Sequence, residues 1–592
     1  MWRSELTVVT NAANSISDDP EPRGRCIKSA AVIAIAAALF YLNSFEGAFV
    51  YDEDYLITNN YAIRHLWPPW RALFNSANAN RPLIGLSNAL NYAVSGLHPW
   101  SYHALNLIIH TLAALALFGV VRRTLLTDRL RDRFGKHSIT LATIVALIWA
   151  VHPLQTESVT YVVQRCESLM GMFYLLTLYC FIRSLDGKGL WSVAAVAACI
   201  AGMLSKEVMV TAPALVLLYD YVFVPGSLKQ KVAKRWRLYA GLIASLIILG
   251  VILEAAPASR SAGLGLKAIS PLRYLTSEFG VIFYYLRLSV WPTGLCLDYL
   301  DWPKATTAVQ IVGYGAVLVG LGAVTIWAVA RRMAAGFAGA WFFLILSVTS
   351  SIVPIQDLVS EHRMYLPLAS LIAFAVLGGY RIGIRLTRRL SPGIVLDAGQ
   401  ARRMALVAVA IVVGLLGLMT VRRNIDYKSW TVMWIDAVTK RPGNPRAHTN
   451  LGWGLMGQNR VEEAIGQFTE ALRLDPNSEP AHCDMGSALL MQGKLDEGKL
   501  HLIRAIQIFP DDQNAHFNLG GILATQHDLD GAIQELAEAV RINPDFAEAH
   551  MELGYAMEMK GMTAEAKNQY LAAIQLRPDW SEKVRTHIAA IP

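Results

Sequence analysis

Residues 443–476 read GNPRAHTNLGWGLMGQNRVEEAIGQFTEALRLDP, and the same 34-residue pattern recurs three more times up to residue 578. Each copy ends on a proline, and one more proline precedes the first copy: Pro442, Pro476, Pro510, Pro544 and Pro578. Each copy also has a bulky residue before a glycine, and a later alanine: Leu451-Gly452 and Ala471, Met485-Gly486 and Ala505, Leu519-Gly520 and Ala539, Leu553-Gly554 and Ala573. Small residues let two helices cross closely, and proline ends a helix. The pattern predicts four helix–turn–helix units in series.

The period and these positions resemble the tetratricopeptide repeat, whose units stack into an α-solenoid. The concave face of such a solenoid typically holds an extended peptide, so we expect a protein or peptide acceptor there. A dimerisation or scaffolding surface is the alternative, which leaves a homodimer open. One histidine recurs in every copy: His448, His482, His516 and His550. Equivalent side chains in neighbouring repeats lie too far apart to share a zinc ion, so we interpret these histidines as packing residues.

The chain before the repeats has the composition of a membrane protein. Of the whole sequence, 54% is hydrophobic and only 17% is charged. Residues 443–592 carry 12 basic and 21 acidic side chains, whereas the preceding residues carry 41 basic and 24 acidic ones. A basic excess beside apolar segments is typical of cytoplasmic loops, and we expect no nucleic-acid partner.

Eleven apolar segments are each about long enough to cross a bilayer. They are residues 27–45, 103–121, 138–153, 157–183, 190–204, 207–224, 238–255, 306–330, 338–354, 363–384 and 404–421. Segment 271–291 carries three charges, so we interpret it as interfacial or re-entrant. We expect four parts: a cytoplasmic segment 1–26, a membrane domain 27–421, a connecting helix 422–442, and repeats with a C-terminal cap in 443–592.

The basic loops set the orientation. Clusters of lysine and arginine lie in residues 122–136, 229–237, 331–332 and 381–403, and also just before the first span. All of them fall on one side if the N-terminus is cytoplasmic. Eleven crossings then place the repeats outside the cytoplasm, in the periplasm of a bacterial inner membrane or in a lumen.

The remaining loops, on the side of the repeats, collect ionisable residues next to the ends of spans. They are Asp52, Glu53, Asp54, His152, Glu157, Lys206, Glu207, Glu361, His362 and Arg363. Ionisable groups at such depths are costly and usually functional. The plainer alternative is that they are ordinary solvated loop residues near the headgroups.

Several of these loops resemble one family. The stretch Gly47–Glu53 resembles the first extracytoplasmic loop of the GT-C glycosyltransferases, and further stretches resemble the TMTC family of transmembrane O-mannosyltransferases with tetratricopeptide repeats. The motifs are Arg81-Pro82-Leu83, Leu90–Ala93, Gly96–Trp100, His152-Pro153 with Glu157, Arg165 with Glu167, Ser205-Lys206-Glu207, and Glu361–Pro367. Where the family usually has Asp-Asp in the first loop, this chain has Asp52-Glu53, as in the protein O-mannosyltransferases proper. The resemblance implies an all-α fold, with a GT-C-like membrane bundle before the solenoid.

The resemblance also implies a reaction: inverting transfer of mannose or another hexose from a polyprenyl-phosphate carrier to a hydroxyl of a protein. Asp52 suits the role of general base, with Glu53 orienting it or binding the acceptor. Cations suit the phosphate leaving group, and the candidates are Arg363, Lys206, Arg81 and Arg165. The supporting residues are His152, Glu157, Glu207, Glu361, His362 and Tyr365. The sequence has no metal-binding motif, and a divalent cation is left open. The alternative is a membrane-anchored scaffold for envelope assembly that has lost catalysis.

Overall fold

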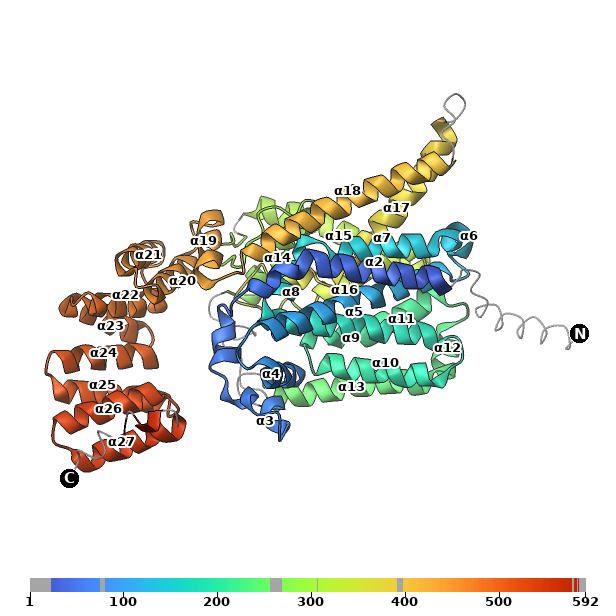
Figure 1. Cartoon of the computed structure of the whole chain (residues 1–592). Helices are drawn as coiled ribbons and strands as arrows, with labels where there is room; N and C mark the ends of the chain where they lie inside the picture. Colours follow the sequence, from blue (N-terminus) through green and yellow to red (C-terminus); the bar gives the residue numbers. More distant parts are fainter. Residues whose placement is uncertain are drawn as a thin grey trace, which may run out of the picture. The chain divides into compact units, whose positions relative to one another are not determined.

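A computed structural model of the chain separates into two compact units (Figure 1). Unit 1 comprises Met1–Leu297 and Trp302–Trp430, and unit 2 comprises Asp298–Asp301 and Thr431–Pro592. The structure describes residues 23–74, 80–255, 269–305, 307–390, 398–577, 580–582 and 584. Pro578, the last proline of the ladder, lies outside this part of the chain.

Unit 1 is a bundle of long helices, and the described residues contain no strand element. Its principal helices are α2 (Arg23–Tyr41), α5 (Trp100–Leu125), α7 (Ser138–Ala150), α9 (Arg165–Ser184), α10 (Gly189–Met203), α11 (Ala212–Phe223), α13 (Trp236–Ala255), α14 (Pro271–Val290), α15 (Ala308–Ala330), α16 (Ala334–Leu346), α17 (Pro367–Leu390) and α18 (Ala398–Ile425). Helix α5 packs against α7 and α9, and α10 packs against α9 and α13. The predicted helical membrane bundle is thus confirmed.

Each of the eleven apolar segments overlaps one of these helices. Among the described residues, seven helices are long and apolar enough to cross a membrane, or eight if one bent pair forms a single span. Two shorter apolar helices, Gly189–Met203 and Ala334–Leu346, add to this set. The total of eleven crossings and their orientation stay predictions.

Two segments differ from their predicted form. The segment 157–183 is broken after α8 (Thr156–Thr160), because Tyr161 has an extended backbone and α9 begins only at Arg165. The segment 271–291 is one continuous helix, α14, which excludes the re-entrant alternative, and the interfacial alternative stays a prediction. A polar contact inside the bundle explains the charge in that helix, because Glu278 is buried beside Arg363.

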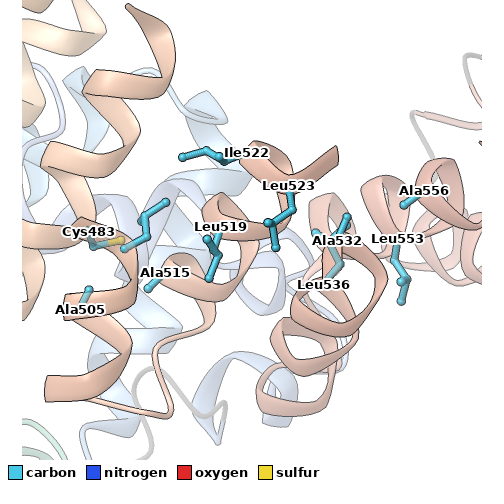
Figure 2. Packing of buried hydrophobic residues seen from close by; sticks show 11 residues of the cluster. Cys483, Ala505, Ala515, Leu519, Ile522, Leu523, Ala532, Leu536, Leu553 and Ala556 are labelled. Carbon is cyan, nitrogen blue, oxygen red and sulfur yellow. The ribbon is translucent and has the colours of Figure 1, made fainter. Parts of the chain in front are cut away.

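Unit 2 contains the four predicted helix pairs and confirms the solenoid. They are α20 (Pro445–Gly457) with α21 (Val461–Leu474), α22 (Glu479–Met491) with α23 (Leu495–Ile508), α24 (Gln513–Thr525) with α25 (Leu529–Ile542), and α26 (Ala547–Met559) with α27 (Thr563–Leu576). A helix α19 (Trp430–Lys440) precedes them, with Trp434 fully buried. Leucines and alanines from successive helices form one continuous core along the stack (Figure 2).

The repeated glycine is needed because the two helices of a pair touch at that point. A Cβ atom built on Gly520 would lie 2.6 Å from Cγ of Leu536, and one built on Gly486 would lie 2.5 Å from Cγ of Leu502. Neither contact is sterically possible without movement of the helices.

The recurring histidine joins the two helices of its own repeat, which confirms its packing role. In the third repeat, Nε2 of His516 lies 3.0 Å from the carbonyl oxygen of Pro510, and Nδ1 lies 2.6 Å from Oε2 of Glu535. His448, His482 and His550 make the same two contacts, each with the proline six residues earlier and with the residue 19 positions later: Gln467, His501 and Gln569.

Candidate active site

The first loop of unit 1 is fixed by one buried carboxylate. Glu53 is only 1% exposed, and both of its side-chain oxygens accept hydrogen bonds from backbone amides. Oε2 accepts from Val50 at 2.6 Å, and Oε1 accepts from Val162 at 2.5 Å and Val163 at 3.3 Å. Val162 and Val163 lie at the break before α9, where amide groups lack a partner within a helix. Glu53 therefore ties the first loop to the start of α9.

The neighbouring Asp52 is held at the surface of this loop. Its side chain is exposed, and its backbone N–H donates to Oη of the buried Tyr161 at 3.1 Å. Burial raises the pKa of Glu53 to about 8, and the amide hydrogen bonds oppose this shift. Of the two acidic residues, Asp52 is the one that a substrate can reach, and Glu53 positions it.

Arg81 has an unusually weak set of partners. It caps α4 (Pro82–Ser95), and its side chain is 30% exposed. Nη1 lies 3.5 Å from Sγ of Cys166, a poor acceptor, and Nη2 lies 4.0 Å from Oε2 of Glu207. Nε is buried and has no hydrogen-bond partner among the described residues. The guanidinium therefore keeps donors available for a ligand.

Lys206 and Glu207 lie next to Arg81. Nζ of Lys206 lies 2.5 Å from Oε2 of Glu167, and both side chains are buried. Burial opposes the charge of Lys206, but Glu167 raises its pKa. Oε2 of Glu207 lies 4.0 Å from Nη2 of Arg81. These side chains form one polar cluster.

His362 and Glu157 form a second pair close to this cluster. Nδ1 of His362 lies 2.6 Å from Oε1 of Glu157, and the backbone N–H of His362 donates to Oε2 at 2.9 Å. Burial, followed by the charge of Lys206, lowers the pKa of His362 well below its ordinary value. The imidazole is thus neutral. Because Nδ1–H donates to the carboxylate, Nε2 is an acceptor.

Two arginines that we predicted to bind the donor phosphate make several contacts within the protein, and their role toward the donor stays a prediction. Arg165 is fully buried and donates to four acceptors at 2.6–3.1 Å: Asn106 Oδ1, Ser87 Oγ, Asn88 Oδ1 and the carbonyl of Tyr102. Arg363 is 6% exposed and donates to the carbonyls of Leu358 at 2.9 Å and Asp357 at 2.6 Å. Its Nη1 also lies 3.6 Å from Oε1 of Glu278. Both guanidinium groups hold loops and helices together.

Three predicted supporting residues are also occupied by structural contacts. His152 accepts a hydrogen bond from the N–H of Leu154 and lies 3.3 Å from the carbonyl of Ser289. Oε1 of Glu361 accepts from the N–H of Cys296 at 2.6 Å. Oη of Tyr365 lies 2.9 Å from Nδ1 of His110 inside the bundle.

The sequence analysis did not identify the carboxylates that form ion pairs with the candidate cations of the site. Glu167 appeared only as part of a family-like motif, and the structure makes it the counter-ion of Lys206. Glu278, the partner of Arg363, appeared only as an interruption of an apolar segment. The sequence did contain one indication of these pairs, a carboxylate within an apolar segment. A carboxylate inside a membrane bundle needs a cation nearby, because its buried charge is otherwise costly. Among the residues that the structure describes, no group of three or more side chains is arranged to hold a metal ion.

Comparisons with known protein families agree with this two-part organisation. Residues 82–253 match the family model described as dolichyl-phosphate-mannose-protein mannosyltransferase. Residues 445–478, 489–551 and 525–581 match tetratricopeptide-repeat models. The mannosyltransferase match contains Glu157, Glu167, Lys206 and Glu207 and begins directly after Arg81.

Three relatives with curated names are each described as a protein O-mannosyl-transferase. The Xenopus laevis tmtc2 protein is 34% identical over 212 residues, which cover 32% of this chain and 24% of that protein. Human TMTC1 is 32% identical, over 30% of this chain and 21% of that protein. Mouse TMTC3 is 24% identical over 506 residues, covering 75% of this chain and 51% of that protein. The chain spans between about a fifth and about half of the length of these relatives.

Among solved structures, the tetratricopeptide-repeat protein YrrB is 23% identical, with a TM-score of 0.23, over 24% of this chain and 75% of that protein. The fold and the family matches together define a class, a helical membrane protein with a mannosyltransferase-type domain and tetratricopeptide repeats. The predicted resemblance to the TMTC O-mannosyltransferases is confirmed, at modest identity.

Proposed function

We propose that the chain is a GT-C-type glycosyltransferase that moves mannose or another hexose from a polyprenyl-phosphate carrier to a protein hydroxyl. One observation carries the proposal. Arg81 is a partly exposed cation with spare donors, and it lies beside Lys206 and Glu207 at the start of the mannosyltransferase match. Asp52 is exposed in the first loop, and we assign it and Arg81 to the same site as the acid and the cation.

The donor requires a cation because its leaving group is a lipid phosphate. As the bond between the anomeric carbon and the phosphate oxygen breaks, its electron pair stays on the phosphate. A guanidinium at that position stabilises the developing charge and can contact two phosphate oxygens at once. We assign this role to Arg81, with the ammonium group of Lys206 adding positive charge behind it.

The acceptor requires a base because its hydroxyl loses a proton during attack. In the proposed step, the acceptor oxygen attacks the anomeric carbon from the face opposite the phosphate, and the proton passes to Asp52. The single displacement inverts the anomeric configuration. The neutral His362 offers Nε2 as an acceptor for a sugar or acceptor hydroxyl, with Glu157 fixing its orientation. Protein acceptors would reach the site from the side of the repeats, outside the cytoplasm.

Replacement of Asp52 tests this mechanism. The full chain in lipid nanodiscs is supplied with polyprenyl-phosphate-linked mannose and a serine- and threonine-containing peptide, and the transferred sugar is counted. We expect Asp52→Asn to lower the rate by roughly 10²–10⁴-fold, as loss of a general base does. Asp54→Asn is the matched control, because Asp54 lies in the same loop and bonds locally to Thr58.

Normal transfer by a folded Asp52→Asn protein would remove Asp52 from the mechanism. The scaffold alternative makes a different prediction, since a scaffold transfers no sugar with either aspartate in place. If the unaltered protein is inactive with mannose and with other hexoses, the scaffold alternative gains support.

A further inference from the structure

The solenoid contains a pocket that the proposed transfer reaction does not use. It has a volume of about 520 Å³ and is lined by residues of α20, α22 and α24, together with Phe509 after α23, Asp512 before α24 and Phe546 before α26. Its walls combine acidic and aromatic side chains: Glu479, Asp484 and Asp512 with Trp453, Phe517 and Phe546.

Asp512 is the most deeply placed of the three acids, with 8% of its surface exposed. Its Oδ1 accepts a hydrogen bond from the backbone N–H of Asn514 at 2.9 Å, which caps α24. Asp512 lines the pocket, and its Oδ2 is buried with no hydrogen-bond partner of standard geometry among the residues that the structure describes. The carboxyl of Glu479 lies next to Asp512 and can join it only by sharing a proton. A buried carboxylate oxygen left without a partner is costly, and a cationic ligand would remove that cost.

The pocket has no cation of its own. Within the described part of the chain, no lysine, arginine or histidine forms an ion pair with Glu479, Asp484 or Asp512. Burial, with the charge of Asp512 acting in the same direction, raises the pKa of Asp484 to about 7 and raises that of Glu479. These shifts mean that Glu479 holds a proton at pH 7 and that Asp484 is partly protonated, so a cationic ligand would take the place of these protons.

The remaining walls suit an organic cation. The rings of Phe517 and Phe546 lie 5.0 Å apart between centroids, and Trp453 is 46% exposed. Aromatic faces attract ammonium and guanidinium groups and also pack against their alkyl stems. A metal ion fits less well, because the described residues contain no set of three metal-ligating side chains at suitable geometry.

We propose that this pocket binds the lysine or arginine side chain of an extended peptide lying along the first helices of the repeats. The aromatic rings would enclose the aliphatic stem, and the carboxylates of Asp512, Asp484 and Glu479 would pair with the charged end. This assignment does not depend on sugar transfer. The assignment predicts that the repeats bind basic peptides more tightly than uncharged ones.

Matched peptides test the proposal. The probe is a fluorescein-labelled nonapeptide of glycine and serine with one central lysine, and the comparison peptide has norleucine, which has a similar shape and no charge. Binding to the full chain in nanodiscs is measured by fluorescence anisotropy with EDTA present. We expect the lysine peptide to bind at least tenfold more tightly, and central arginine to behave like lysine. Equal binding of the lysine and norleucine peptides would overturn the proposal.

Protein variants locate the contact. Asp512→Asn retains the helix cap but removes the charge, so we expect it to lose at least tenfold in affinity for the lysine peptide alone. Asp511→Asn is the control, because it removes the same charge from an exposed neighbour that pairs with Arg541. Asp484→Asn is a second test if Asp512→Asn fails to fold. Retained lysine selectivity in a folded Asp512→Asn or Asp484→Asn protein would contradict the assignment.

Discussion

Buried charged side chains of the two units differ in the number of hydrogen-bond partners that they have. In unit 1, the guanidinium of Arg165 donates to four acceptors, and Glu53 accepts from three backbone amides. In the solenoid, Oδ2 of Asp512 has no partner among the described residues. Arg81 in unit 1 and Asp512 in unit 2 each have a buried polar atom that makes no hydrogen bond among the described residues, as have other charged side chains such as Glu278, and we assign these two to ligands because Arg81 is partly exposed and Asp512 lines a pocket. A buried ion with a full set of partners holds the fold, whereas one with spare bonding capacity is available for binding.

The largest expected effect comes from removing a fully paired ion. Arg165→Met should prevent accumulation of folded protein, because its four acceptors lose their donor and breaking such a buried network costs about 3–5 kcal/mol. Arg81→Met is the matched comparison and should fold, since Arg81 has few contacts to lose. Size-exclusion profiles and thermal melting of the two detergent-solubilised variants measure the difference. Equal yields of folded protein from both variants would contradict the distinction between a structural Arg165 and a ligand-binding Arg81.

Arg363→Lys distinguishes a structural role from a phosphate-binding role at a second arginine. Lysine keeps a positive charge beside Glu278, but it cannot reproduce both hydrogen bonds to the carbonyls of Leu358 and Asp357. We expect a loss of about 2 kcal/mol in stability, since hydrogen bonds to charged groups are the strong ones. The KM for the lipid-linked donor should stay unchanged. A raised donor KM in a fully stable variant would restore Arg363 as a phosphate ligand.

A smaller effect is expected where the solenoid helices touch. Gly520→Ala places a methyl group 2.6 Å from Leu536, so we expect overpacking to cost about 1–3 kcal/mol. Gly521→Ala is the control, because nothing lies within 4 Å of a Cβ there. Cys483 is buried and is the only cysteine after residue 430, so its rate of thiol labelling in the full chain reports opening of the repeats. Equal labelling rates in the two variants would contradict the predicted contact.

The smallest effect concerns pH and His516. Its hydrogen bond to Glu535 raises the pKa of His516 in the folded chain, although burial opposes the shift. A raised pKa stabilises the fold below the unfolded value near 6.5, and this contribution is lost as pH rises through the folded value. Glu535→Gln gives the third repeat the partner found in the first and fourth, Gln467 and Gln569. We expect it to speed Cys483 labelling at pH 6 and not at pH 8.5, each relative to the unaltered protein at the same pH. An equal effect at both values would exclude a charged pair.

Periodic features of the sequence predicted the fold well. Prolines 34 residues apart placed all four helix pairs, because each repeat depends on local residues and on its neighbours alone. Apolar runs likewise placed the helices of unit 1. The break after Thr160 was missed, because it depends on Glu53, whose carboxylate accepts from Val162 and Val163 more than 100 residues away in the chain.

The site was less predictable, because the availability of a charged group depends on distant partners. The sequence showed four candidate cations, but nothing local distinguished Arg81 from Arg165. The difference comes from Asn106, Ser87 and Asn88, which lie 59 to 78 residues from Arg165 and occupy its nitrogens. In the same way, nothing local in the sequence indicated that Asp512 lines a pocket. It caps α24, and the structure adds that its second oxygen is buried without a hydrogen-bond partner among the described residues.

The most direct test of the central claim is the dependence of transfer on donor concentration in Arg81→Gln. Arg71→Gln is the control, an exposed arginine ten residues earlier. Because Arg81 is assigned to the phosphate, we predict at least a tenfold higher KM for polyprenyl-phosphate-linked mannose, an unchanged KM for the peptide acceptor, and an unchanged melting temperature. Arg71→Gln should match the unaltered protein. A folded Arg81→Gln protein with the donor KM of the unaltered chain would show that the donor phosphate binds elsewhere.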